Sequence, residues 1–240
     1  MHSPRRASFY RKTFLMGSLS DAQTDFKFDS TLSFGTPVGH TSKRIVDIVI
    51  ALSGIILLAP LFIICFVLTR VSSRGPAISR HRRVGFGGKS FDCLKFRTMD
   101  ADAPERLRKL LEVDPTAAAE WAKCQKLRND PRVTRIGAVL RKSGLDELPQ
   151  LFNVLIGDMS IVGPRPVTED ELWRYGASVK AYTACRPGIT GLWQVTGRSD
   201  TSCEQRISCD VYYARMWSLA LDSKIMIVTI PFALFTEGTH

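Results

Sequence analysis

The sequence predicts an α+β fold that is predominantly helical, with a re-entrant membrane helix hairpin followed by a larger domain of short strands and surface amphipathic helices. Three observations predict this architecture. An uncharged apolar stretch over 48–69 is long enough to enter a bilayer. Helical periodicity dominates the remaining chain, and short alternating segments between glycines read as strands. With 45% apolar residues among 240, the chain can also bury a substantial core.

Residues 1–42 form the first part of the chain, which we expect to be a disordered basic arm. The stretch is polar, without helical or strand periodicity, and it contains a basic cluster of Arg5, Arg6, Arg11 and Lys12. Its short apolar run, Phe14-Leu15-Met16, does not form the apolar region of a signal peptide.

Residues 43–72 contain the membrane segment. Pro60 follows Ala59 in mid-run and removes a helical hydrogen bond, so we expect the helix to break at Ala59-Pro60. Lysine and arginine flank both ends, and such residues favour the cytoplasmic side of a membrane. A helix that enters the membrane and returns to the same face satisfies both flanks. A spanning helix and the buried helix of a soluble protein are the alternatives.

Residues 73–240 form the third part, a membrane-associated domain on the cytosolic side. Three glycines over 85–88 mark a turn before the strand-like FDCLKF (91–96). Residues 100–128 predict a surface helix pair, divided at Asp114-Pro115. The sequence also predicts helices over 169–180 and 203–221, an irregular structured loop over 185–198, and an apolar stretch over 224–235 that is too short to span a membrane.

The charge and cysteine content restrict the functions that the chain can have. Lysine and arginine exceed aspartate and glutamate by 33 to 23, which gives a net charge of +10 and a pI near 9.6. Such an excess favours an anionic partner: nucleic acid, a phosphorylated substrate or an anionic membrane. The six cysteines form no CxxC pair and no Cys/His ligand spacing, which argues against a disulfide framework or structural zinc and indicates a reducing compartment.

The candidate site lies in residues 143–166, SGLDELPQLFNVLIGDMSIVGPRP, where an acidic pair interrupts an apolar helical run. On an α-helix the side chains of Asp146 and Glu147 point about 100° apart, so they cannot bind one small ligand as a stacked pair. They can divide the work: one carboxylate attacks a phosphorus atom, and the other holds a divalent cation such as Mg²⁺. An acidic pair near a helix start also occurs for structural reasons, because it complements the helix dipole.

Cationic and aromatic residues complete a site for phosphate. Pro164 and Pro166 restrict the backbone around Arg165, whose planar guanidinium suits a phosphate. Four further cations are candidates for a clamp on a diphosphate: Lys95, Arg97, Arg186 and Arg198. In the glycine-rich segment, Trp193 offers a stacking surface and Gln194 an amide for a base edge.

Four motifs make the chain resemble a known family. They are KFRTM (95–99), LDELPQLFNVLIGDMSIVGPRP (145–166), RPGITGLWQVTGR (186–198) and DVYY (210–213). From about Lys43 to its C-terminus the chain resembles the bacterial sugar transferases, which are monotopic phosphoglycosyl transferases or polyprenyl-phosphate hexose-1-phosphate transferases. It is most similar to the short, ExoY-like branch that primes exopolysaccharide synthesis and lacks the large N-terminal membrane domain of longer members.

The resemblance implies a specific reaction. Family members transfer a sugar 1-phosphate from a UDP-sugar to a polyprenyl phosphate such as undecaprenyl phosphate, release UMP and use Mg²⁺. By this resemblance, Asp146 is the covalent nucleophile, Glu147 holds Mg²⁺ and Arg165 contacts phosphate. Ala59-Pro60 matches the break of the family's re-entrant helix, which is more often Ser-Pro, and Asp210 of the DVYY motif joins the expected substrate-binding residues.

The resemblance also implies a location, at the bacterial inner (cytoplasmic) membrane with the catalytic domain in the cytosol. It favours galactose or glucose as the sugar, but the sequence identifies neither the sugar nor the polyprenyl length, and it leaves a homodimer open. A metal-dependent nucleotide-sugar hydrolase or lipid-phosphate phosphatase is the alternative with the same acidic pair. A membrane-tethered nucleic-acid binder is disfavoured, because the basic residues cluster beside the membrane run instead of forming one stripe.

Overall fold

The computed structural model describes residues 36–124, 127, 130–196 and 203–235. Most of these residues are helical, and the strands among them form two sheets of two strands each. This confirms the predicted α+β class. Residues 1–35 of the expected arm lie outside the described part, and helix α2 begins within that arm at His40. The division of the chain into three parts stays a prediction.

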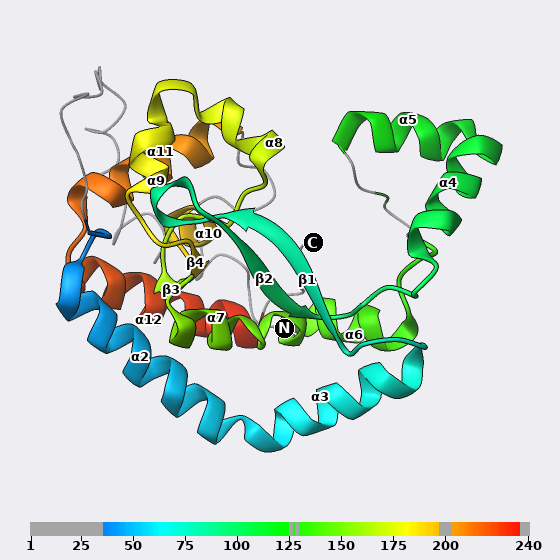
Figure 1. Ribbon diagram of the computed structural model, residues 1–240, viewed down its shortest axis with the longest axis horizontal. Helices are drawn as coiled ribbons and strands as arrows, with labels where there is room; N and C mark the ends of the chain where they lie inside the picture. The colour runs from blue at the N-terminus through cyan, green and yellow to red at the C-terminus, as the bar shows by residue number, and fades with distance from the viewer. Residues whose placement is uncertain (1–35, 125–126, 128–129, 197–202, 236–240) are drawn as a thin grey trace, which may run out of the picture.

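Helices α2 (His40–Leu57) and α3 (Ala59–Ser72) form a bent pair along one side of the molecule (Figure 1). The bend is 67°, and Leu58 separates the helices immediately before Ala59-Pro60. Pro60 lies in the first turn of α3, where a helix does not use the N–H group that proline lacks. The position of the break is therefore confirmed.

Among the described helices, only the bent pair has the length and composition that a membrane segment needs. No single described helix is long and apolar enough to cross a membrane, whereas α2 and α3 together pass on length and composition. Their exposed large apolar side chains are Ile45, Ile48, Val49, Leu52, Ile56, Leu57, Ile63, Ile64, Phe66, Val67, Leu68 and Val71. An exposed apolar surface of this kind marks an interaction site, and the re-entrant topology stays a prediction.

Strands β1 (Ile78–Val84) and β2 (Ser90–Phe96) form the predicted hairpin, paired antiparallel. Their connection is the short 3₁₀ helix η2 (Phe86–Gly88), where Gly87 and Gly88 adopt positive φ angles that glycine accepts without strain. Figure 1 shows the hairpin as a long curved ribbon across the middle of the molecule.

Helix α7 (Gln150–Ile156) connects this hairpin to α2. Ala51 of α2 and Val154 of α7 are fully buried in one cluster with Phe91 and Cys93 of β2. The side chain of Asn153 accepts a hydrogen bond from the Leu94 amide (2.9 Å) and donates one to the Asp92 carbonyl (2.8 Å). Asn153 therefore fixes the position of β2.

Strands β3 (Ser160–Val162) and β4 (Gly188–Thr190) form a parallel pair. The sequence predicts an irregular loop over 185–198, and the structure corrects this, because the segment contains β4 and helix α10 (Leu192–Thr196). The glycines permit close backbone contact there: a Cβ atom on Gly188 would lie 2.1 Å from the amide nitrogen of Gly163. Parallel strands end at the same edge, so the segments that follow β3 and β4 meet.

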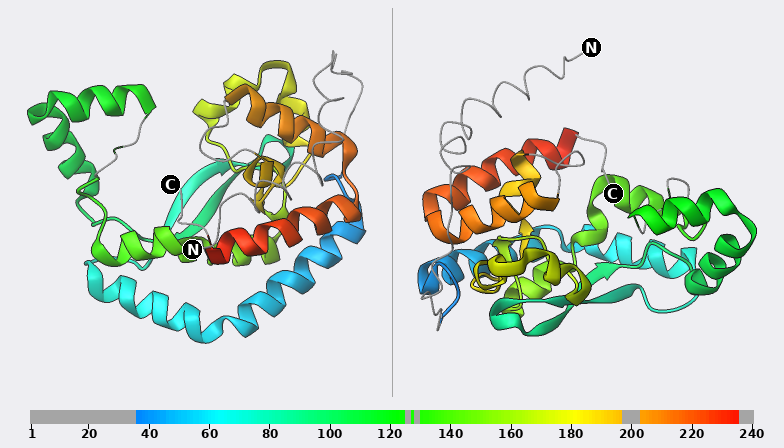
Figure 2. Two further views of the ribbon diagram at one scale, coloured as in Figure 1. Left: turned by 180° about the vertical axis from the view of Figure 1, so that it is seen from behind. Right: turned by 90° about the horizontal axis from the view of Figure 1, so that it is seen from above.

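The predicted pair of surface helices is confirmed. Helices α4 (Ala103–Val113) and α5 (Pro115–Cys124) project from one end of the molecule (Figure 2). Helix α6 (Arg135–Ser143) returns the chain to the body and leads into the 3₁₀ turn η3 (Leu145–Glu147).

Two predicted helices are shorter than expected. The segment 169–180 is not one helix: it is divided into α8 (Glu169–Leu172), η4 (Trp173–Ser178) and the start of α9 (Val179–Thr183), because Gly176 adopts a positive φ of 48°. The helix expected over 203–221 ends at Met216 as α11 (Cys203–Met216), and α12 (Leu219–Phe235) follows it.

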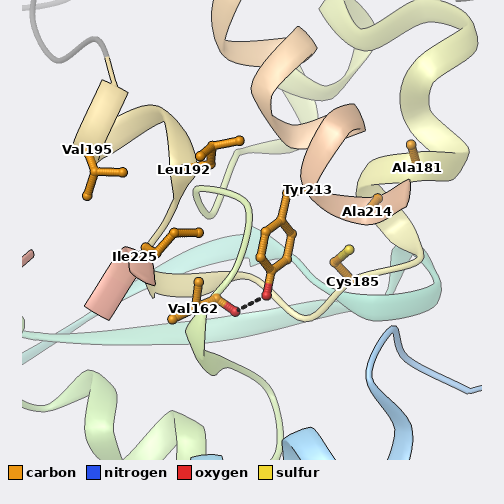
Figure 3. Packing of buried hydrophobic residues seen from close by; sticks show 8 residues of the cluster. All are labelled: Val162, Ala181, Cys185, Leu192, Val195, Tyr213, Ala214 and Ile225. Atoms are coloured by element: carbon orange, nitrogen blue, oxygen red, sulfur yellow. Dashed lines mark hydrogen bonds between the residues drawn. The ribbon is translucent and has the colours of Figure 1, made fainter. Parts of the chain in front are cut away.

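The largest described core cluster joins α11 and α12 to β3, and Figure 3 shows its side chains. The side chain of Tyr213 extends into this cluster, and its hydroxyl donates a hydrogen bond to the carbonyl of Val162 (3.0 Å). The buried members are Val162, Ala181, Cys185, Leu192, Val195, Tyr213, Ala214 and Ile225. This core holds the end of β3, and thus the segment with Arg165, in place.

Candidate active site

The acidic pair lies on the 3₁₀ turn η3 and not on an α-helix as the sequence predicts. Gly144 ends α6 with a positive φ of 70°, and the chain then tightens for one turn before α7 begins. With three residues per turn, neighbouring side chains point about 120° apart. Asp146 is buried, with 4% of its surface exposed. Glu147 is partly exposed and forms a 2.5 Å ion pair with Lys95 on β2. The two carboxylates therefore have different surroundings.

Arg141 provides a positive charge that interacts with Asp146. Its Nε donates to the hydroxyl of Thr98 (2.8 Å), which fixes the guanidinium between α6 and the chain after β2. Burial lowers the pKa of Arg141, and the attraction of Asp146 and Asp130 opposes this effect. The sequence interpretation assigned no role to Arg141, although a basic residue in the last turn before an acidic pair was a usable signal.

Arg165 lies where the parallel strands bring two segments together. It follows β3, and Trp193 follows β4; the Arg165 guanidinium lies 5.5 Å from the centre of the indole ring. Burial lowers the pKa of Arg165, as do the charges of Arg206 and Arg83, while Glu171 and Glu147 raise it. The interaction with Glu147 connects Arg165 to the acidic pair.

Two further arginines, which the sequence interpretation did not select, belong to the same group. The guanidinium of Arg206, from α11, lies 4.9 Å from the centre of the Trp193 ring. Arg83, from β1, forms a 3.4 Å ion pair with Glu171. Both residues are at least 60 positions from Asp146 in the sequence, so no local pattern connects them to it.

Asp210 is a buried acid whose charge interacts with Arg206 and Arg165. It is 2% exposed and accepts a 2.8 Å hydrogen bond from the hydroxyl of Tyr175. Burial raises the pKa of Asp210 to about 7, and the Tyr175 hydrogen bond and the charges of Arg206 and Arg165 limit the rise. Asp210 thus supports the arginines from inside the protein.

Three predicted residues bind the protein's own backbone outside this group. Arg97 donates to the carbonyl of Ser73 (2.7 Å), Arg186 to that of Gly157 (2.8 Å), and Gln194 to that of Ile189 (3.3 Å). Arg186 thereby caps the C-terminal end of α7, where positive charge is favourable. Arg198 lies outside the described residues.

The group is suited to an anion with several phosphate oxygens. Its five cations come from five separate segments of the chain, and the carboxylates Asp146, Glu147 and Glu171 compensate only part of their charge. The cations are Arg83, Lys95, Arg141, Arg165 and Arg206.

A metal site built by the protein alone is absent from the described residues, because no group of three or more His, Cys, Asp or Glu side chains is arranged to hold an ion. Mg²⁺ is commonly held by one or two carboxylates together with substrate phosphates and water. The adjacent Asp146 and Glu147, together with a group of cations suited to phosphate, fit that requirement.

Comparison with known proteins identifies relatives along nearly the whole described chain. A family model described as bacterial sugar transferase matches residues 38–236. The exopolysaccharide production protein ExoY of Rhizobium meliloti (strain 1021) is 46% identical over 204 residues, which cover 85% of this chain and 90% of that protein.

Two relatives have more explicit names. The undecaprenyl-phosphate galactose phosphotransferase of Salmonella typhimurium (strain LT2) is 48% identical over 199 residues, 82% of this chain and 41% of that protein. The UDP-glucose:undecaprenyl-phosphate glucose-1-phosphate transferase of Caulobacter vibrioides is 39% identical over 240 residues, 94% of this chain and 84% of that protein.

Proposed function

The chain belongs to the bacterial sugar transferase family, and from this premise we propose that it transfers a sugar 1-phosphate from a UDP-sugar to undecaprenyl phosphate and releases UMP. The names of the relatives support this reaction and favour galactose or glucose as the sugar. The observation that carries the proposal is the position of Asp146, a buried carboxylate that adjoins Glu147 of the Lys95–Glu147 ion pair and interacts with the charge of Arg141.

The reaction proceeds in two displacements at one phosphorus atom. A carboxylate oxygen of Asp146 attacks the phosphate that carries the sugar, and the bond between that phosphorus and the bridging oxygen breaks. UMP leaves with the bridging oxygen, and the phosphosugar remains as an acyl phosphate on Asp146. An oxygen of the lipid phosphate then attacks the same phosphorus and frees the carboxylate.

The surrounding cations stabilise the negative charge that moves between phosphates during both displacements. Arg141 and Lys95 lie at the acidic pair, and Arg165 extends the positive charge towards Trp193. Glu147 would hold Mg²⁺ together with the diphosphate, and the ion would neutralise phosphate charge there.

The acceptor is a lipid, so we place the protein on the inner face of the bacterial cytoplasmic membrane. The exposed apolar side chains of α2 and α3 support this location, because they give the bent pair a surface suited to hydrocarbon. If the helix pair α2–α3 enters the membrane and returns to the same face, the catalytic domain and the start of α2 both lie in the cytosol.

Release of UMP tests the reaction. Purified protein in lipid nanodiscs is given UDP-sugars that differ in the sugar, with and without undecaprenyl phosphate and Mg²⁺. We expect multiple turnovers only with the lipid acceptor and Mg²⁺, and the highest rate with UDP-galactose or UDP-glucose. Sustained UMP release without the acceptor would instead identify a nucleotide-sugar hydrolase.

Cysteine labelling tests the topology. Thr41→Cys and Arg74→Cys place exposed thiols at the two ends of the bent pair, in a background where the exposed Cys203 is serine. A membrane-impermeant reagent should label both positions in inverted membrane vesicles and neither in intact spheroplasts. Labelling from opposite sides would show that the segment spans the membrane.

A further inference from the structure

Arg206 and Arg165 both form cation–π contacts with the indole ring of Trp193. The two guanidiniums lie 4.9 Å and 5.5 Å from the ring centre, and their charges repel each other across it. The site therefore places two positive charges on one rigid aromatic support. Two cations held so closely are favourable only when an anion can lie between or beside them.

The same place contains buried hydrogen-bond donors that have no acceptor among the described residues. The Nε of Arg206 and the Nε1 of Trp193 are both buried, and neither donates to any residue that the structure describes. Trp193 itself is only 9% exposed. Leaving a buried donor unsatisfied is costly, so an acceptor-rich ligand at this position would be stabilised.

Arg206 has a buried acid one turn farther along its helix. Asp210 follows it by four residues on α11, so both side chains lie on one face of the helix, and Tyr175 holds the Asp210 carboxylate. The charges of Arg206 and Asp210 interact.

Arg165 interacts with the acidic pair and with Arg206. Asp146 adjoins Glu147 on η3, the charges of Glu147 and Arg206 both act on Arg165, and Arg206 shares the Trp193 ring with Arg165. A UDP-sugar presents two phosphates in line: the one that carries the sugar, which Asp146 attacks, and the one that leaves with the nucleoside. If the first phosphate lies at Asp146, the two arginines on the Trp193 ring are available for the second.

We propose that Arg206 binds the phosphate that leaves with the nucleoside, and that Arg165 lies between the two phosphates of the donor. This inference rests on the proposed function. It assigns Arg206 to the nucleotide donor and its UMP product, and not to the lipid phosphate. Arg206 thus stabilises the charge that develops on the leaving group.

The test compares Arg206→Gln and Arg206→Lys with Arg174→Gln, an exposed arginine outside this group, as the control. The protein is in nanodiscs, and we measure KM for the UDP-sugar, KM for undecaprenyl phosphate and inhibition by UMP. Loss of a charge-assisted hydrogen bond should raise the donor KM and the UMP inhibition constant of Arg206→Gln by about 10- to 100-fold. The acceptor KM should change less than about twofold, Arg206→Lys should keep part of the affinity, and the control should match the wild type.

A calorimetric titration with UMP alone extends the test to variants that turn over too slowly for kinetics. Weaker UMP binding to Arg206→Gln, with its unfolding temperature unchanged, supports the inference. Unchanged UMP binding, or a rise confined to the acceptor KM, overturns it while leaving the proposed function intact. If the wild-type protein shows no acceptor-dependent UMP release at all, the proposed function fails first.

Discussion

Substitution of Asp222 tests how the bent helix pair is joined to the catalytic domain. Asp222, near the start of α12, forms a 2.7 Å ion pair with Lys43 of α2, and the exposed fractions of the two side chains are 5% and 7%. Its carboxylate also accepts hydrogen bonds from the Tyr213 hydroxyl (2.7 Å) and the Trp217 indole (3.0 Å). Asp222→Leu would remove an acceptor from each of these three donors.

The expected loss of stability follows from burial. Breaking a buried ion pair by removing one partner costs about 3–5 kcal/mol, because a charge stays buried without compensation. The Tyr213 hydroxyl keeps the Val162 carbonyl as an acceptor, so we add nothing for it. For a protein of this length, each kcal/mol corresponds to about 2–4 °C, so the unfolding temperature should fall by about 10 °C.

Thermal unfolding in detergent, followed by circular dichroism, measures this effect. The control is Glu112→Gln, which breaks the exposed ion pair with Arg108 and should change the unfolding temperature by less than about 2 °C. The double variant Lys43→Met/Asp222→Leu removes the uncompensated charge and should recover at least half of the loss. The reasoning is refuted if Asp222→Leu behaves like Glu112→Gln, or if the double variant is less stable than Asp222→Leu.

Three further substitutions test the supports of the site. Burial raises the pKa of Asp210 to about 7 from 3.8, so its neutral form stabilises the protein fully below pH 3.8, and this contribution is lost as the pH rises through about 7. Urea unfolding between pH 4 and 8 should therefore show Asp210→Asn gaining up to about 4 kcal/mol relative to wild type; a difference independent of pH would contradict this. Asn153→Leu removes two hydrogen bonds to β2 and should cost about 2–4 kcal/mol in the same assay and lower kcat, because β2 carries Lys95; unchanged stability would show that other contacts hold the strand. Gly137→Ala places a Cβ atom 2.0 Å from the Thr98 carbonyl oxygen, so it should destabilise the protein by about 1–3 kcal/mol. Activity should also fall, because α6 leads into the acidic pair. Wild-type stability and UMP release in this variant would contradict so close a contact between Gly137 and Thr98.

The sequence identified features that depend on local chemistry. Pro60 fixes the bend between α2 and α3 because proline cannot form the helical hydrogen bond at that position. Alternation over FDCLKF and the glycines before it predict the hairpin for equally local reasons. The adjacency of Asp146 and Glu147 needs no structure to be seen, and their roles stay proposals.

Features that depend on tertiary contact could not be predicted in this way. Strand β4 has only three residues and pairs through glycines, so neither periodicity nor side-chain preference reveals it. Arg206 and Trp193 come together because α11 packs across α10, and nothing in the spacing of the two residues indicates it. Arg97 looks like a partner of Lys95 in the sequence, yet it follows the end of β2 and binds the Ser73 carbonyl instead.

The central claim is that Asp146 forms a covalent bond to the phosphosugar. The direct measurement is the intact mass of the protein after incubation with UDP-galactose or UDP-glucose and Mg²⁺ in the absence of a lipid acceptor. The wild-type protein should gain the mass of one hexose phosphate and release one UMP per chain, and undecaprenyl phosphate should remove the added mass. Asp146→Asn should gain nothing, whereas the same mass gain on that variant would contradict the assignment.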